Sequence, residues 1–151
     1  MRYTTIIKTV FITLLLSGYL TNLRAEDTLE QLNEKAEEEH SPYRWVAVDN
    51  ADGKATVIQE LQGTVIFSST LKGPRKTNLD TKIKNREKNN GRSKKITLKE
   101  MRMLPPAGHW GQLHVEAWVF DNEGEEVVYT IWFRTPGDYT VKGPWTKTPS
   151  T

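Results

Sequence analysis

Three residues of metal-ligating type lie close together in the sequence, namely His109, His114 and Glu116. His114 and Glu116 are two positions apart, so they would share one face of a β-strand. A zinc site needs four protein ligands, or three and a water, in a fixed geometry. The chain has no cysteine, and its only further histidine is His40. We therefore expect surface or packed histidines, no metal site and no cofactor.

The residues that nucleophilic catalysis requires are also not arranged for it. No serine lies in a G-x-S-x-G elbow, and without cysteine a Cys–His pair is impossible. The segment Gly108-His-Trp-Gly111 does not lead into a helix, as a phosphate-binding loop would. We expect a protein that is not an enzyme. An enzyme with carboxylates from distant parts of the chain is an alternative, because such pairs leave no local motif.

Aromatic residues near the C-terminus suggest a binding face. Aromatic and polar side chains that occur together are typical of ligand pockets and protein interfaces. The alternative is that another element covers these side chains as part of the core, since large aromatics mainly supply buried apolar surface. The candidate residues of this aromatic face are Trp118, Trp132, His114, Tyr139 and Trp145.

A strongly basic segment spans residues 72–95 and contains only two acids, Asp80 and Glu87. Clustered Lys and Arg attract polyanions, so an anionic glycan, lipopolysaccharide or an acidic protein are candidate partners. Nucleic acid is disfavoured as a partner, because no aromatic residue is present there for base stacking. The alternative is a solvated loop, partly neutralised by the acidic residues of 26–39. The candidate binding residues are Lys72, Arg75, Lys76, Lys82, Lys84, Arg86, Lys88, Arg92, Lys94 and Lys95.

The first 25 residues have the pattern of a secretory signal peptide. Arg2 and Lys8 precede a short apolar run, and a small residue, Ala25, comes before Glu26. We expect cleavage between Ala25 and Glu26, a periplasmic or secreted protein, and no transmembrane segment in the mature chain. The leader holds three bases and no acid, so the mature chain has 18 basic and 19 acidic residues. A generally basic protein of the nucleic-acid-binding type is therefore not indicated.

Hydrophobic periodicity predicts a single β-domain over residues 43–147, preceded by an acidic arm or short helix over 26–42. Thr28 and Gln31 have the spacing of a capping box, but the apolar stripe that follows is thin. Strands are expected over 43–49 and 55–61, with Asn50 paired to Lys54 around an Asp-Gly turn. A further strand is expected over 96–104. We expect the basic segment 72–95 to form a long exposed loop or a protruding hairpin.

The clearest hairpin comprises residues 112–121 and 125–134. Asn122-Glu123-Gly124 fits a three-residue loop that pairs Asp121 with Glu125. That register predicts one apolar face, with the opposite pairs Leu113–Phe133, Val115–Ile131, Ala117–Tyr129 and Val119–Val127. It places Trp118 and Trp132 together on the other face.

These patterns predict an all-β fold, an antiparallel meander of about six to eight strands in a small barrel or sandwich. The tryptophan-rich strands of a small exported domain resemble, in general build, periplasmic inhibitor, immunity and lipocalin-like proteins. No motif supports the transfer of a role to any residue. We expect a non-catalytic binding module of a bacterial envelope, of the inhibitor or immunity type, that recognises a protein or an anionic glycan. A structural or assembly accessory of a surface or secretion machine, pairing through strand edges, is the alternative.

Overall fold

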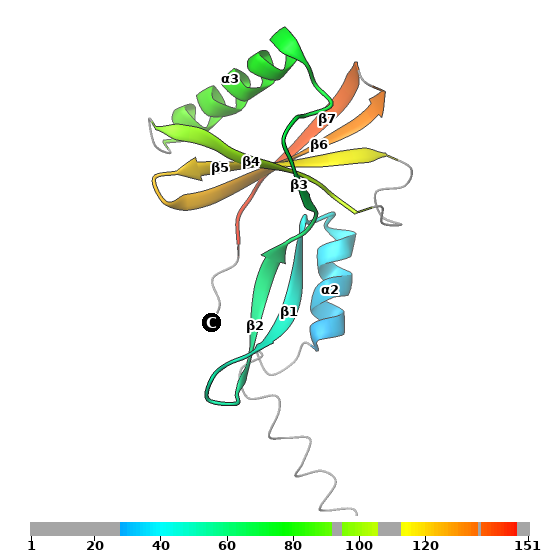
Figure 1. The fold of residues 1–151 in the computed structure, drawn as a ribbon, viewed down its shortest axis with the longest axis vertical. Coiled ribbons are helices and arrows are strands. Elements are labelled where there is room, and N and C mark those ends of the chain that lie inside the picture. Colours follow the sequence, from blue (N-terminus) through cyan, green and yellow to red (C-terminus); the bar gives the residue numbers. More distant parts are fainter. Residues whose placement is uncertain (1–27, 92–94, 106–112, 136, 148–151) are drawn as a thin grey trace, which may run out of the picture.

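The computed structural model describes residues 28–91, 95–105, 113–135 and 137–147. Five antiparallel strands form one sheet in the order β3-β4-β5-β6-β7, and β1 and β2 form a separate two-stranded sheet (Figure 1). The expected antiparallel, mainly β meander is confirmed, but the large sheet is open and does not close into a barrel. The signal peptide, the cleavage site at Ala25 and Glu26, and residues Arg92, Lys94 and His109 lie outside the described residues. The elements are α2 (Leu29–Glu38), β1 (Tyr43–Asp49), β2 (Ala55–Leu61), β3 (Thr64–Ile66), α3 (Gly73–Asn89), β4 (Ile96–Met103), β5 (His114–Asn122), β6 (Glu125–Thr135) and β7 (Asp138–Trp145).

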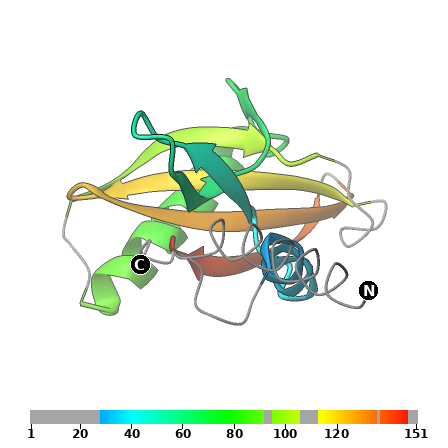
Figure 2. The ribbon, with the colours of Figure 1, turned by 90° about the horizontal axis from the view of Figure 1, so that it is seen from below.

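The five-stranded sheet is covered on both faces. Helix α3 lies on one face, and the β1–β2 hairpin with α2 lies on the other (Figures 1 and 2). Alternate residues of the central strands therefore enter two different cores. The core under α3 contains Leu79, Ile83, Met101, Trp118, Phe120, Val127, Tyr129, Ile131 and Phe133. The core under the hairpin contains Tyr43, Leu104, Val115, Ala117, Val119, Val128 and Trp132.

The N-terminal segment forms the short helix that its capping residues predict. The Thr28 side chain accepts a hydrogen bond from Gln31 N, and Gln31 Oε1 accepts one from Thr28 N, which completes the capping box. Asn33 then joins this helix to β1, because its side-chain amide exchanges two hydrogen bonds with the backbone of Trp45, at 2.8 and 3.0 Å. The helix is thus held by polar contacts as well as by its thin apolar stripe.

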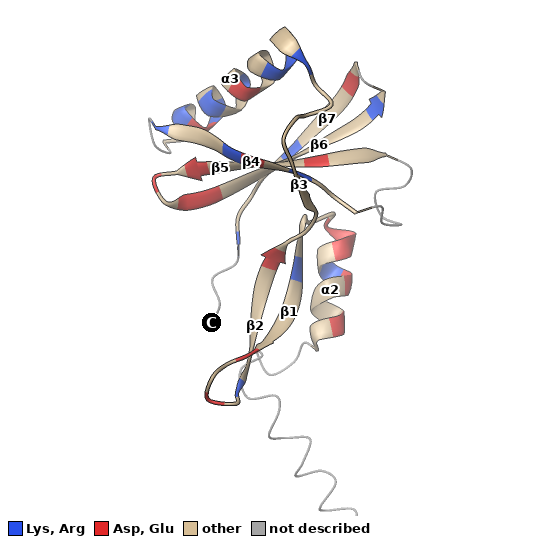
Figure 3. Cartoon of the chain, viewed as in Figure 1, with Lys and Arg blue, Asp and Glu red and all other residues tan. Residues whose placement is uncertain are grey.

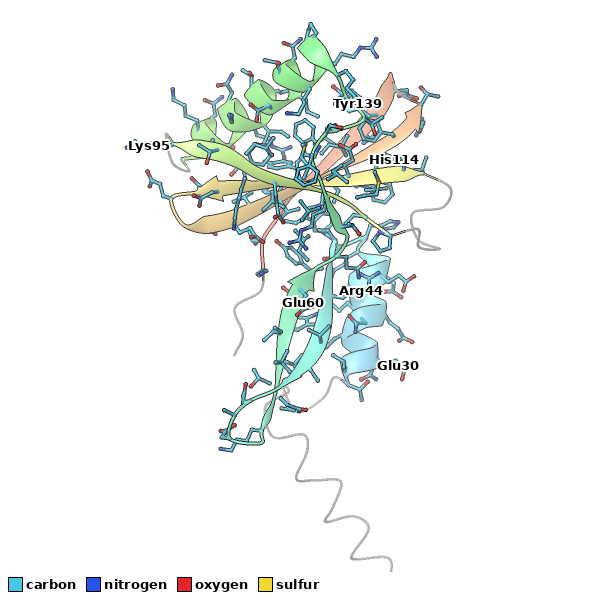
Figure 4. The ribbon with its side chains drawn as sticks, viewed as in Figure 1. Glu30, Arg44, Glu60, Lys95, His114 and Tyr139 are labelled. Atoms are coloured by element: carbon cyan, nitrogen blue, oxygen red, sulfur yellow. The ribbon has the colours of Figure 1, made fainter. Side chains whose placement is uncertain are left out.

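The register predicted for the first hairpin is confirmed. Arg44 pairs with Glu60 and Val46 with Ile58, and Asn50 N donates to Lys54 O at 2.8 Å. Figure 4 shows Arg44 and Glu60 on these neighbouring strands. Opposite charges and apolar pairs coincide in only one register, so side-chain type was sufficient to fix it.

The register predicted for the β5–β6 hairpin is wrong by one residue. The strands pair Asn122 with Glu125 and Trp118 with Tyr129. The turn consists of two residues, Glu123 and Gly124, with φ of 55° and 92°, as a type I′ turn requires. A slip of one residue reverses which side chains share a face, so Trp118 and Trp132 lie on opposite faces of the sheet.

The basic segment forms a helix, and the expectation of a loop or hairpin is wrong for residues 73–89. Pro74 lies in the first turn, where its missing N–H costs no hydrogen bond. Leu79, Ile83 and Glu87 are each four residues apart and are all buried on one side of the helix. Two apolar residues suffice as anchors because the sheet beneath presents a large aromatic surface. Within the described residues, no helix is long and apolar enough to cross a membrane.

Candidate binding surface on helix α3

The inner side of α3 packs against the sheet, and these contacts determine which residues its outer side presents to the solvent. Leu79 and Ile83 pack into the aromatic core, and the Tyr129 hydroxyl donates a hydrogen bond to Glu87 Oε1. Tyr129 and Glu87 are both fully buried. A buried carboxylate accepts hydrogen bonds strongly and is costly to leave unpaired, so this contact anchors the last turn of α3 to β6.

The outer side of α3 forms a broad, shallow depression lined only by polar residues. Its lining contains four asparagines, one threonine and two cations, and no acid. All seven residues are exposed, and of the two cations Arg86 also contacts the Tyr129 ring of the sheet. Amide groups both donate and accept hydrogen bonds, whereas Lys and Arg only donate them. The lining residues are Asn78, Thr81, Lys82, Asn85, Arg86, Asn89 and Asn90.

The charge of α3 is positive on its exposed surface, because its two acids are already engaged. Glu87 is buried against Tyr129, and Asp80 forms an ion pair with Lys84 at 2.7 Å. Lys82 and Lys88 are exposed. Figure 3 shows Lys and Arg along α3, in contrast to the acidic α2. The basic residues Arg75, Lys76, Lys82, Lys84, Arg86 and Lys88 thus lie on this one helix.

Two cations of α3 also contact aromatic rings of the sheet. The Lys76 ammonium lies 5.7 Å from the Trp118 ring centroid, and the Arg86 guanidinium lies 5.8 Å from that of Tyr129. Such cation–π contacts are worth about 0.5–1 kcal/mol at exposed sites. Lys72 precedes the helix and donates to Ser68 Oγ at 3.2 Å, and Lys95 precedes β4.

A buried carboxylate, Glu116, fixes the chain where it enters α3. Glu116 accepts hydrogen bonds from Ser69 Oγ at 2.6 Å, Thr70 N at 2.6 Å and Trp118 Nε1 at 2.9 Å. Burial raises the pKa of Glu116, but the hydrogen bonds from Ser69, Trp118 and Thr70 outweigh it and hold this pKa below its ordinary value. Glu116 is therefore an ionised, saturated acceptor that holds the connection between β3 and α3.

The polar cluster at Glu116 does not have the geometry of a catalytic triad. A triad histidine contacts its nucleophile and its acid through different ring nitrogens. Here one nitrogen, His114 Nε2, lies 2.8 Å from Thr70 Oγ1 and 3.3 Å from Glu116 Oε1. The Ser69 hydroxyl is buried and bonded to the carboxylate. In the part of the chain that the structure describes, no His, Asp and Glu side chains gather in a group that could hold a metal ion.

The five residues expected to form one aromatic face are divided between the two cores. Trp118, His114 and Tyr139 belong to the side under α3, where the rings of His114 and Tyr139 each contact Phe133. His114 and Tyr139 lie at the same end of the sheet (Figure 4). Trp132 and Trp145 belong to the other side. The expectation of a single aromatic binding face, which rested on the slipped register, is wrong.

Trp132 and Trp145 have structural partners on their own side of the sheet. Both indole nitrogens donate to Thr130 Oγ1, at 3.0 and 3.2 Å. The Lys142 ammonium covers the Trp132 ring at 3.8 Å from its centroid, and the His40 ring lies 5.5 Å from that ring. Trp132 is buried, so it offers little surface to a ligand.

Sequence reasoning found the cations of this surface but not the polar residues between them. Asn78, Thr81, Asn85 and Asn89 lie in a segment whose richness in Asn and Lys favours a loop. The signal for a helix was present in the spacing of four between Leu79 and Ile83, with Pro74 before them and Gly91 after them. That spacing would have placed these polar residues on the opposite, outward side.

Comparison of the chain with protein families, with curated proteins and with solved structures gives no significant match. The functional proposal therefore rests on the geometry of the described residues.

Proposed function

We propose that this protein is a non-catalytic binding module that recognises an anionic glycan through the outer side of α3. The observation that carries the proposal is the polar depression on that helix, which offers Lys82 and Arg86 among asparagines and lacks any acid. Lys and Arg bind carboxylate, sulfate or phosphate groups. Asparagine amides complement sugar hydroxyls, which also donate and accept.

The shape of the surface supports an extended ligand. The depression follows the helix from Asn78 to Asn90, which corresponds to about 18 Å at about 1.5 Å per residue. Its openness suits a chain that lies along the helix, whereas a small molecule needs a deeper site to bury its surface. Its lining includes no aromatic residue, so a nucleic acid would lack a stacking platform.

The leader predicted for residues 1–25 supports an extracytoplasmic location for this activity. We propose that the protein is exported to the periplasm or secreted, where acidic polysaccharides and lipopolysaccharide are accessible to it. Identification of the N-terminal residue of exported protein by mass spectrometry tests this location. Glu26 is the expected first residue, and an intact Met1 would contradict export.

The binding experiment compares the protein with the double variant Lys82→Ala/Arg86→Ala on an immobilised acidic polysaccharide, polygalacturonate. The variant should bind at least about tenfold more weakly and with a smaller salt dependence, since fewer charge pairs form. The matched control, Lys35→Ala/Lys54→Ala, removes two exposed cations from α2 and the first turn and should bind normally. Equal affinity of both variants at low salt would overturn the proposal.

A second variant separates recognition of sugar from attraction to any polyanion. Asn85→Ala/Asn89→Ala keeps every charge but removes two amides from the depression. It should weaken binding to polygalacturonate and leave binding to polyphosphate, which has no sugar hydroxyls, unchanged. Equal losses on both polymers, or on neither, would mean that the amides do not read sugar hydroxyls.

A further inference from the structure

The C-terminal end of α3 carries a reactive pair of residues on its exposed side. Asn90 lines the polar depression, and it is followed by Gly91, which is exposed as well. No other asparagine in the sequence is followed by glycine. Glycine has no Cβ, so its backbone nitrogen meets little steric hindrance on approach to the preceding side chain. In such a pair that nitrogen can attack the side-chain amide carbon of the asparagine, which is the first step of deamidation.

The backbone of this pair is held weakly. Asn90 caps α3 with a φ of −81° and a ψ of 12°, in a sparsely populated region outside the helical one. Gly91 N donates to Lys88 O at 3.3 Å, a distance longer than the about 2.7–3.2 Å of most such bonds. Helix ends open at little cost in free energy. The Gly91 nitrogen is therefore released for attack without disturbance of the core.

The other described asparagines are held more firmly than Asn90. The Asn33 amide exchanges two hydrogen bonds with the backbone of β1. The Asn50 amide donates to Thr56 Oγ1 at 2.5 Å, and Asn122 is buried. The remaining three lie inside α3, where the helical hydrogen-bond pattern engages the N–H of the following residue. They are Asn78, Asn85 and Asn89.

Cations near the pair favour the reaction. Loss of the Gly91 amide proton generates the nucleophile, and its attack places negative charge on the carbonyl oxygen of the Asn90 side chain. Arg86 lines the same depression, and Lys88 lies in the last helical turn, whereas Glu87 is buried against the sheet. Positive charges stabilise a developing anion. They also offset the negative end of the helix dipole, which would otherwise oppose this charge.

We propose that Asn90 is a site of spontaneous deamidation in the folded protein. The Gly91 nitrogen forms a bond to the amide carbon of the Asn90 side chain, and the bond from that carbon to its amide nitrogen breaks. The departing NH2 group takes the proton that Gly91 lost and leaves as ammonia. Water then opens the cyclic imide at either carbonyl carbon, which yields aspartate or isoaspartate. Either product replaces a neutral amide by a carboxylate.

The new carboxylate would change the binding surface, a consequence that rests on the proposed function, whereas the deamidation itself does not. The depression contains Lys82 and Arg86 and no acid. A carboxylate at position 90 would repel an anionic glycan and compete with it for these two cations. Because hydrolysis of the imide does not restore the amide, the affinity of the surface for polyanions should fall as the protein ages.

Peptide mapping by mass spectrometry of folded protein, incubated in mildly alkaline buffer, tests the site. Asn90 should deamidate at least about tenfold faster than each other described asparagine, which corresponds to a barrier lower by about 1.4 kcal/mol. The product should contain isoaspartate, and the rate should rise with pH because the nucleophile is the deprotonated nitrogen. An Asn90 that stays intact in the folded protein, but reacts in the urea-unfolded chain, would overturn the proposal.

The variant Gly91→Ala tests which atom attacks. Its new Cβ enters open space, so it hinders the approach of the nitrogen without a clash elsewhere. Deamidation of Asn90 should slow at least about tenfold. An unchanged rate would overturn the assignment of Gly91 N as the nucleophile.

The variant Asn90→Asp, which carries the product charge from the start, measures the effect on binding. It should bind polygalacturonate about threefold more weakly than wild type at low salt, and the difference should shrink as salt screens the charge. The control, Asn50→Asp, places a carboxylate at the exposed turn of the β1–β2 hairpin, away from α3, and should bind normally. Equal affinity of the two variants would overturn the effect of deamidation on binding. If Lys82→Ala/Arg86→Ala still loses affinity in that case, the proposed function stands without it.

Discussion

Ser69 and Glu116 lie 47 residues apart in the sequence, and a hydrogen bond of 2.6 Å between Ser69 Oγ and Glu116 Oε2 joins them inside the protein. This contact, with those from Thr70 N and Trp118 Nε1, makes Glu116 the point where the β3–α3 connection meets the central strand β5. A fully buried carboxylate with this many donors is a structural anchor, and it sets where α3 begins. The proposed binding surface on α3 therefore depends on a residue that does not touch it.

Replacement of Glu116 by Gln should lower the free energy of unfolding by about 2–3 kcal/mol, because hydrogen bonds to a charged acceptor are worth about 1.5–3 kcal/mol. Urea denaturation at pH 7 measures the change. Glu34→Gln, at an exposed position of α2, is the matched control and should leave stability within about 0.5 kcal/mol. A Glu116→Gln protein as stable as the control would contradict the role of the charge.

The stability that Glu116 provides should also depend on pH. The folded state holds the pKa of Glu116 below its ordinary value of 4.5, so folding favours the ionised form. This contribution is present in full above the unfolded pKa and is lost as the pH falls through the folded pKa. The difference in unfolding free energy between wild type and Glu116→Gln should therefore shrink below about pH 4.5. A difference that grows on acidification would have the wrong sign.

Replacement of Tyr129 by Phe should loosen α3 from the sheet. The variant leaves the buried Glu87 carboxylate without its Tyr129 donor, at a cost of about 1–3 kcal/mol. Amides of the last turns of α3 should then exchange faster with solvent than those of β5. Tyr139→Phe, which removes a hydroxyl from a partly exposed tyrosine, is the control, and uniform acceleration in all elements would argue against a local anchor.

Replacement of Glu123 by Asn should stabilise the protein by about 0.5–1 kcal/mol. Glu123 has a φ of 55°, in the left-handed region that asparagine adopts more readily than glutamate. Thermal unfolding measures the gain. Glu125→Asn, at the first strand position after the turn, should give no gain, and a loss at position 123 would contradict the type I′ turn and the register that it defines.

Replacement of Gly63 by Ala should lower the free energy of unfolding by at least about 2 kcal/mol. Gly63 has a φ of 94°, and a Cβ there would overlap with the carbonyl oxygen of Met103. Backbone atoms cannot move aside as a flexible side chain can, so the cost of the steric overlap adds to the cost of the positive φ. Gly53→Ala is the control, because Gly53 has a φ of 77° but open space around the new Cβ. Its loss of stability measures the cost of a positive φ without the steric overlap.

The sequence by itself determined the local structure wherever neighbouring residues interact. The Thr28–Gln31 capping box, the Asn50–Lys54 turn and the Arg44–Glu60 register, and the antiparallel order of the C-terminal strands were all predictable. In each case a few adjacent side chains favour one arrangement. The positive charge of residues 72–95 was equally evident, since charge does not depend on conformation.

Only the tertiary structure decided which side chains share a face. In the β5–β6 hairpin only the slipped register gives a wholly apolar face, whereas the observed register places Thr130 on one face and Glu116 on the other. Because the strands are buried on both sides, apolar pairing favoured the wrong register. The Glu123–Gly124 turn and the two layers that cover the sheet selected the register that separates Trp118 from Trp132. Helix α3 likewise depends on tertiary contacts, because the helical tendency of its own sequence is weak. Tyr129 donates a hydrogen bond to Glu87, and Leu79 and Ile83 pack into the aromatic core.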